Sequence, residues 1–238
     1  MGAITSHARS TDLFHRAYHW IAISEAQKRE HVLMGIPAER ITVIPHFFET
    51  NEELPPYPKE GDALYVGRLS PEKGVDRLLL AWEKIQHCGR TLWIVGDGPE
   101  RAVLEATAQS KKLRNVHFTG FLKHKEMDQI WKKAACSIIP SVWKEPFGMV
   151  VLEAWAKQRP VVAHEIGALP ELITHNRNGL IVSSDSAQGL SESILEILLN
   201  PEASEVMGKD GFEKLKIRYS KSLWQDSIRP IFSTKPEQ

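Results

Sequence analysis

Hydrophobic and polar positions follow two different patterns along most of this chain, one typical of strands and one typical of helices. From residue 63 onward, short apolar runs rich in Val and Ile recur, each typical of a strand buried on both faces. These predicted strands are "ALYVG" (63–67), "TLWIVG" (91–96), "NVHFTG" (115–120), "CSIIPS" (136–141), "PVVAH" (160–164) and "GLIV" (179–182). Segments between them, such as 75–86 and 125–134, have helical spacing of apolar residues. Strict alternation of strand and helix predicts a doubly wound parallel sheet, a Rossmann-like α/β domain.

The first 56 residues follow a smaller pattern that ends in a Pro-rich stretch. Two strand candidates flank one helix candidate, with Ser24 as its N-cap, in the segments 19–24, 25–35 and 40–48. One such unit is too small for a core of its own, and "EELPPYPKEGD" has the composition of an interdomain linker. We therefore expect residues 1–56 to be the last βαβ unit of an otherwise missing N-terminal domain, plus linker. Residues 57–238 are expected to form a second domain that ends in helices.

Composition narrows the function classes. Of 238 residues, 42% are hydrophobic and 25% charged, as in ordinary globular proteins, and 30 basic residues balance 30 acidic ones. No long run of one charge is present, which argues against a nucleic-acid partner. Cys88 and Cys136 follow no metal-ligand spacing, and a free thiol is the expected state. Without a signal peptide or an apolar run of about 20 residues, a cytoplasmic location is expected.

The loop after the first strand of the predicted sheet is a candidate phosphate site. In an open parallel sheet, ligands bind beyond the carboxyl ends of the strands. The loop "GRLSPEKG" offers Gly67 for a tight turn and the cations Arg68 and Lys73, close to where a helix begins. A helix N-terminus adds partial positive charge and free N–H groups, so this loop could hold a diphosphate. Two solvated surface cations are the simpler alternative.

The stretch "EPFGMVVLE" carries two glutamates around a predicted helix start. Glu145 lies before the helix and Glu153 lies within it among apolar residues, where a carboxylate needs hydrogen-bond donors or an exposed edge. Eight residues span roughly 12 Å along a helix-like path, which is long for two carboxylates acting on one glycosidic bond. We therefore expect the two to hold different parts of one elongated ligand. The helix start offers the N–H groups of Phe147, Gly148, Met149 and Val150.

Taken together, six motifs in this order resemble glycosyltransferase family 4, retaining enzymes of the GT-B fold. They are "VGRLSPEKG", "VGDGP", "FTGFL", "PSVWKEPFGMVVLEAWAKQRPVV", "GALPELI" and "NGLIV". The resemblance covers nearly the whole chain and is mainly to the C-terminal nucleotide-sugar-binding domain of the family. Its E-x7-E element is matched by Glu145 and Glu153.

The resemblance implies a role for each site residue. Arg68 and Lys73, next to Gly67, would bind the donor diphosphate, and Glu153 would hold the ribose hydroxyls. Glu145 would be catalytic and, with the backbone at Phe147, Gly148, Met149 and Val150, would hold the transferred sugar. The backbone around Leu122 would contact the base.

The resemblance also implies the ligands and partners. The donor would be a UDP- or GDP-linked sugar, with no cofactor and, since no Asp-x-Asp element is present, no metal. The acceptor would be a glycan or glycolipid reached through the missing N-terminal domain, in polysaccharide, lipopolysaccharide or glycolipid synthesis. Peripheral association with the inner face of the membrane is compatible with such an acceptor.

Two features depart from the family pattern, and two alternatives stay open. The N-terminal domain, which supplies a catalytic histidine in the family, is missing, and His46 in "VIPHFFE" stands where "IPNG" is usual. We interpret His46 as a local loop variant and His164 as a scaffold histidine. One alternative is a nucleotide-sugar-binding module that is inactive without a separate acceptor domain. The other is a different GT-B enzyme, such as a nucleotide-sugar epimerase.

Overall fold

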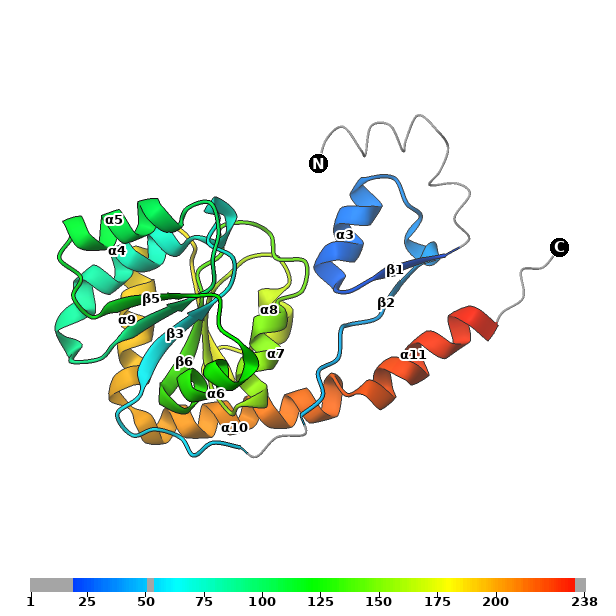
Figure 1. Cartoon of the computed structure of the whole chain (residues 1–238). Coiled ribbons are helices and arrows are strands. Elements are labelled where there is room, and N and C mark those ends of the chain that lie inside the picture. Colours follow the sequence, from blue (N-terminus) through cyan, green and yellow to red (C-terminus); the bar gives the residue numbers. More distant parts are fainter. Residues whose placement is uncertain (1–18, 51–53, 234–238) are drawn as a thin grey trace.

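A computed structural model describes residues 19–50 and 54–233 of the chain (Figure 1). Its centre is a six-stranded sheet in the order β5-β4-β3-β6-β7-β8, and every neighbouring pair is parallel. The strands are β3 (Asp62–Val66), β4 (Leu92–Val95), β5 (Val116–Gly120), β6 (Ala134–Ile139), β7 (Val161–His164) and β8 (Gly179–Val182). All six predicted strands are confirmed to within two residues at each end.

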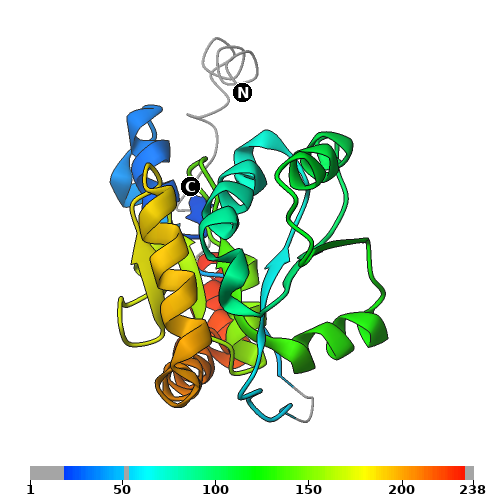
Figure 2. The same ribbon diagram turned by 90° about the vertical axis from the view of Figure 1, so that its left-hand side faces the viewer.

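Helices cover both faces of this sheet, as Figure 2 shows from the side. The helices are α4 (Val75–Ile85), α5 (Arg101–Ser110), α6 (His124–Lys133), α7 (Met149–Ala156), α8 (Leu169–Leu172), α9 (Ala187–Leu199), α10 (Pro201–Arg218) and α11 (Lys221–Ser233). Apolar residues of α4, α5 and α9 form one buried cluster with one face of the strands. Apolar residues of α6, α7 and α8 form a second cluster on the other face. Because strand side chains alternate between faces, both faces are buried, and the doubly wound prediction is confirmed.

The N-terminal unit forms its own small sheet. β1 (Trp20–Ala22) pairs in parallel with β2 (Ile41–Val43), and α3 (Glu25–Leu33) connects them. The Ser24 hydroxyl accepts a hydrogen bond from the Gln27 N–H, so the predicted N-cap is confirmed. Among the described residues of this unit, the buried cluster consists of Ala22, Ile36 and Ile41. The rest of its stability must come from the surfaces on which it lies.

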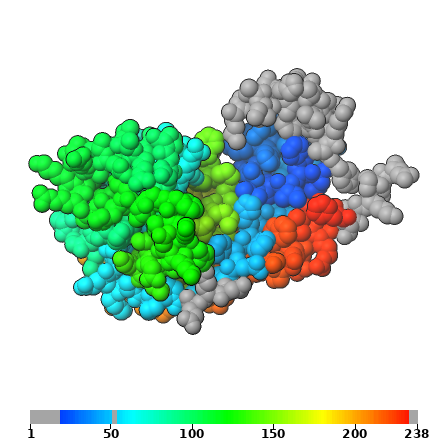
Figure 3. All heavy atoms as spheres, in the orientation of Figure 1, coloured from blue at the N-terminus to red at the C-terminus, as the bar shows by residue number. Residues whose placement is uncertain are grey.

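The Pro-rich stretch and α11 are two of the segments that connect the N-terminal unit to the rest of the chain. The described part of the Pro-rich stretch lies against the large sheet, where the buried Arg159 guanidinium donates to the Pro56 carbonyl and the Tyr57 hydroxyl donates to the Ala135 carbonyl. The C-terminal α11 returns to the segment after β2, where the rings of Phe47 and Trp224 lie 5.3 Å apart. Figure 3 shows this light-blue segment between the green surface of the domain that carries the large sheet and the red α11. Residues 1–18 and 51–53 of the predicted first unit lie outside the described residues.

The strand order reverses between β3 and β6. The chain runs outward from β3 through β4 to β5, then returns to β6 and runs outward on the other side. A crevice forms at the carboxyl ends of strands at such a point, and ligands of open α/β sheets bind there. The loops after β3 and β6 meet closely at Gly74, which has a φ of 66° and where a Cβ atom would lie 2.0 Å from the Pro140 carbonyl oxygen. Glycine is therefore required for the two loops to meet.

Candidate functional site

Two adjoining cavities lie at the carboxyl ends of β3 and β6, and Val66 lines both. The Glu153 cavity has a volume of about 540 Å³ and also includes Leu122. The Glu145 cavity has a volume of about 310 Å³ and includes Lys73, Glu145 and the start of α7. The two glutamates thus face different cavities, which agrees with the expectation that they hold different parts of one long ligand.

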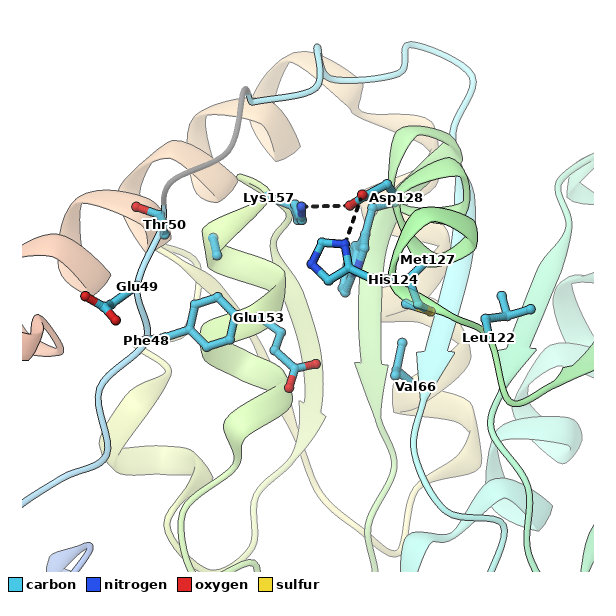
Figure 4. Close-up of a pocket in the computed structure, with 12 residues that line it drawn as sticks. Phe48, Glu49, Thr50, Val66, Leu122, His124, Met127, Asp128, Glu153 and Lys157 are labelled. Carbon is cyan, nitrogen blue, oxygen red and sulfur yellow. Dashed lines mark hydrogen bonds and ion pairs between the residues drawn. The ribbon is translucent and has the colours of Figure 1, made fainter.

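The Glu153 carboxylate is a half-buried charge without a partner among the described residues. It projects into the space between the Phe48 ring and Val66 (Figure 4). Within the described parts of the chain, no donor forms a hydrogen bond or ion pair with it. Burial therefore raises the pKa of Glu153, because removal from water penalises the charged form. A carboxylate kept in such a place is prepared to accept hydrogen bonds from a ligand.

The remaining walls of the Glu153 cavity combine apolar and charged groups. Leu122, Met127 and Trp131 supply apolar surface. At the far end, Asp128 accepts from Lys157 at 3.0 Å and lies 3.3 Å from the His124 ring, as the dashed lines of Figure 4 show. Burial opposes the ionisation of Asp128, but the hydrogen bond and charge of Lys157, with a smaller contribution from His124, outweigh burial and lower the Asp128 pKa. Apolar surface with a few fixed polar groups is typical of a small-molecule site.

The Glu145 cavity is centred on an ion pair. Lys73, at the end of the 3₁₀ turn η2 (Pro71–Lys73), donates to Glu145 Oε1 at 2.6 Å. The Ser141 hydroxyl donates to the same oxygen, also at 2.6 Å. The Glu145 side chain is only 10% exposed and that of Lys73 is 31% exposed, so the pair lies at the cavity wall. Two N–H groups of Lys73 and the second carboxylate oxygen of Glu145 remain available to a ligand.

The start of α7 forms the opposite wall of the Glu145 cavity. Gly148 is the N-cap residue with a φ of 106°, a conformation that favours glycine. The backbone N–H groups at this end have no acceptor among the residues that the structure describes; they belong to Phe147, Gly148, Met149 and Val150. Free N–H groups and the helix dipole favour an anion or a polar hydroxyl at this position.

All but one of the predicted site residues line one of these cavities. Leu122 and Glu153 lie in the larger one, and Gly67, Lys73, Glu145 and residues 147–150 lie in the smaller one. Arg68 is the exception, because its side chain is exposed and lines neither cavity. Its backbone carbonyl accepts from the Tyr65 hydroxyl at 2.8 Å. The structure therefore brings Lys73, but not Arg68, to the wall of the site.

Several residues that line the cavities were not predicted from the sequence, and some of them lie in the segment after β2. His46 lines the Glu145 cavity and meets the Phe147 ring edge-on, with centroids 5.2 Å apart. Its interpretation as a loop variant is therefore incomplete. Phe48 lines the Glu153 cavity from the same segment. The only sequence signal was that this segment departs from the usual family pattern at His46. His164 is buried, and its Nδ1 lies 3.1 Å from the Ser141 carbonyl oxygen, as the scaffold interpretation expected.

Two further observations concern metal-ion binding and membrane-spanning helices. Among the described residues, no group of three or more His, Cys, Asp or Glu side chains is placed to hold a metal ion. In the same parts of the chain, no helix is both long and apolar enough to span a bilayer.

Several glycosyltransferases resemble this chain in sequence or in structure. The alpha-D-kanosaminyltransferase of Streptomyces kanamyceticus is 31% identical over 172 residues, which are 71% of this chain and 44% of that protein. The chain thus spans less than half the length of that relative. The structure of S. aureus TarM, in a complex that includes UDP, matches 92% of this chain and 45% of its own, with a TM-score of 0.85 and 22% identity.

A second structure is that of Anabaena HepE in complex with UDP-glucose. It matches 96% of this chain and 68% of its own, with a TM-score of 0.81 and 25% identity. These neighbours are glycosyltransferases of the GT-B fold, and this chain shares that fold over the matched part. The model of the family described as "Glycosyl transferases group 1" matches residues 47–214. The chain therefore belongs to the group 1 glycosyltransferases.

Proposed function

We propose that this chain is the donor-binding part of a retaining, metal-independent glycosyltransferase of family 4. It would bind a UDP- or GDP-linked sugar for transfer to an acceptor glycan or glycolipid, at the cytoplasmic side of a membrane. The observation that carries the proposal is the pair of adjoining cavities. One holds a carboxylate that no donor contacts among the described residues, and the other holds a cation and the N-terminus of α7. HepE, which has been crystallised with UDP-glucose, supports this class of donor.

The two cavities suggest where each part of the donor would bind. Glu153 would accept hydrogen bonds from the two ribose hydroxyls, with the base against Leu122. The diphosphate would pass Val66, which lines both cavities, and would bind Lys73 and the N–H groups at the start of α7. The transferred sugar would then lie against Glu145, whose free oxygen accepts from a sugar hydroxyl. Residues 1–56 and 57–238 remain our proposed division of the chain into an N-terminal unit with linker and a donor domain.

The charges suggest how the reaction would be assisted. When the bond between the sugar and the diphosphate breaks, its electron pair stays on the departing diphosphate, which gains negative charge. Lys73 and the start of α7 are fixed positive groups that can stabilise this charge. The Glu145 carboxylate, held by Ser141 and Lys73, would keep the sugar in place while the acceptor hydroxyl oxygen bonds to it and releases its proton to the departing diphosphate.

Titration of the 238-residue chain with nucleotides tests the proposal. We expect UDP or GDP, and the corresponding sugar nucleotide, to bind with heat detectable by calorimetry, and adenosine diphosphate to bind more weakly. Binding of uridine or guanosine alone should be weaker than binding of the diphosphate. Absence of binding by every uridine and guanosine diphosphate would refute a donor site at these cavities. Conversion of a sugar nucleotide to its epimer would instead favour the epimerase alternative.

A further inference from the structure

The loop that carries Glu145 is held on both sides by the N-terminal unit. Lys144, the residue before it, pairs with Glu30 of α3 at 2.6 Å. The carbonyl of Pro146, the residue after it, accepts from the Ser24 hydroxyl, also at 2.6 Å. Ser24 is at the same time the N-cap of α3. Two contacts from an element more than 110 positions away in the sequence thus flank one glutamate.

A third contact reaches α3 from the short helix α8. The Glu171 carboxylate accepts from the backbone N–H groups of Glu25 at 2.9 Å and Ala26 at 2.6 Å. It also accepts from the Arg29 guanidinium at 3.2 Å. These are the first N–H groups of α3, which have no partner within the helix. A carboxylate from elsewhere in the chain therefore completes the N-terminal cap of α3, with help from the helix dipole.

The segment that leads to Glu171 touches Glu145 directly. The Ala168 N–H donates to the Glu145 carbonyl at 2.9 Å. Gly167 packs so closely that a Cβ atom there would lie 2.4 Å from the Glu145 backbone nitrogen and oxygen. Movement of α8 therefore moves the Glu145 backbone, and α8 is held at its other end by α3.

We propose that Glu171 and Ser24 are positioning residues for Glu145, and this inference rests on the proposed function of that glutamate. They fix the loop 144–146 by joining it to the start of α3. Docking of the N-terminal unit then determines where the Glu145 carboxylate lies in its cavity. Separation of α3 from α8 frees the loop, and the sugar end of the site loses its geometry while the nucleoside end at Glu153 stays intact.

Hydrogen exchange tests this coupling without any ligand. The Val142 N–H donates to the Glu72 carbonyl, and the Ala168 N–H donates to Glu145, so these two amides report on the loop. In Glu171→Gln, the amide group can replace only one of the acceptor oxygens. We expect exchange at α3 and at both reporters to rise by about fivefold, the factor that loss of one helix cap produces. Exchange in β8 should not change.

The matched control is Glu165→Gln, which removes an exposed carboxylate from the loop before α8. It should leave all these rates unchanged. Faster exchange in α3 alone would overturn the proposal, because the cap would then hold α3 without holding the loop. An equal rise in every strand would overturn it as well, because Glu171 would then serve only global stability.

Ligand binding gives a second and independent measurement. We expect Glu171→Gln to weaken UDP-glucose binding about fivefold relative to UDP, since only the sugar reaches Glu145. Equal weakening of both ligands, or of neither, would overturn the positioning role. If the wild-type chain bound no sugar nucleotide, the proposed function would fail, while the exchange measurement would still decide whether the coupling exists.

Discussion

Substitution of the half-buried Glu153 by glutamine separates the effect of its charge on stability from its effect on ligand binding. Without a ligand, Glu153 has no hydrogen-bond donor among the described residues, and burial raises its pKa. A raised pKa means that the folded state favours the protonated acid more than the unfolded state does. Stability is therefore lost as the pH rises from the ordinary glutamate value of 4.5 through the higher value of the folded protein. At neutral pH the charge of Glu153 destabilises the fold.

The same substitution should weaken nucleotide binding. A carboxylate accepts two charge-assisted hydrogen bonds from a ribose diol, whereas glutamine keeps one acceptor oxygen and points an N–H₂ group at the second hydroxyl. Loss of one such bond and weakening of the other amounts to about 1 to 3 kcal/mol, or roughly 5- to 150-fold in affinity. Glu153→Gln should thus bind UDP or GDP more weakly and unfold at a higher temperature near pH 7.

Calorimetric titration and thermal unfolding between pH 4 and pH 8 measure both effects. The stability advantage of Glu153→Gln should shrink toward zero as the pH falls through the pKa of Glu153, where wild type becomes protonated. Wild-type affinity should fall over the same range, and the affinity of the variant should not. Glu202→Gln, at an exposed carboxylate paired with Lys59, is the control and should show neither effect on binding nor a gain in stability. Unchanged nucleotide affinity in Glu153→Gln would refute the ribose role.

Three further predictions concern the Glu145 cavity. Lys73→Met removes the partner of a 10% exposed carboxylate, so we expect the free energy of unfolding to fall by about 1 to 3 kcal/mol in urea titrations, and UDP or GDP binding to weaken. Wild-type nucleotide binding should be the same with and without EDTA and should fall with rising salt; a strict need for Mg²⁺ or Mn²⁺ would contradict this. Gly148→Ala should destabilise by more than the 1 to 2 kcal/mol or so of a left-handed backbone, because its Cβ would lie 2.8 Å from the Leu169 side chain. Gly89→Ala, with a φ of 77° and no atom within 4 Å, isolates the backbone cost, and equal losses in the two variants would show that the Leu169 contact is not limiting.

Local patterns in the sequence were sufficient for the large sheet. Each strand from β3 to β8 is an apolar run whose length and composition do not depend on distant residues, so its position could be predicted within two residues. The rule that ligands bind at strand ends then selected the loops with Lys73, Glu145 and Gly148. The cap at Ser24 was predictable for the same reason, since a cap is formed within four residues.

Contacts between distant segments could only come from the tertiary structure. Side-chain chemistry alone suggested Lys73 and Arg68 as equal phosphate ligands, but the fold turns Lys73 to Glu145 and leaves Arg68 exposed. His46 and Phe48 line the cavities because α11 and the α3–α8 contact hold their segment across the sheet edge. An apolar period of two or 3.6 residues predicts which face of a strand or helix a side chain occupies. It does not predict which residues of other elements pack against that face. What lies opposite is decided by how the N-terminal unit docks, through contacts such as that of Glu171, whose partners are about 145 residues away.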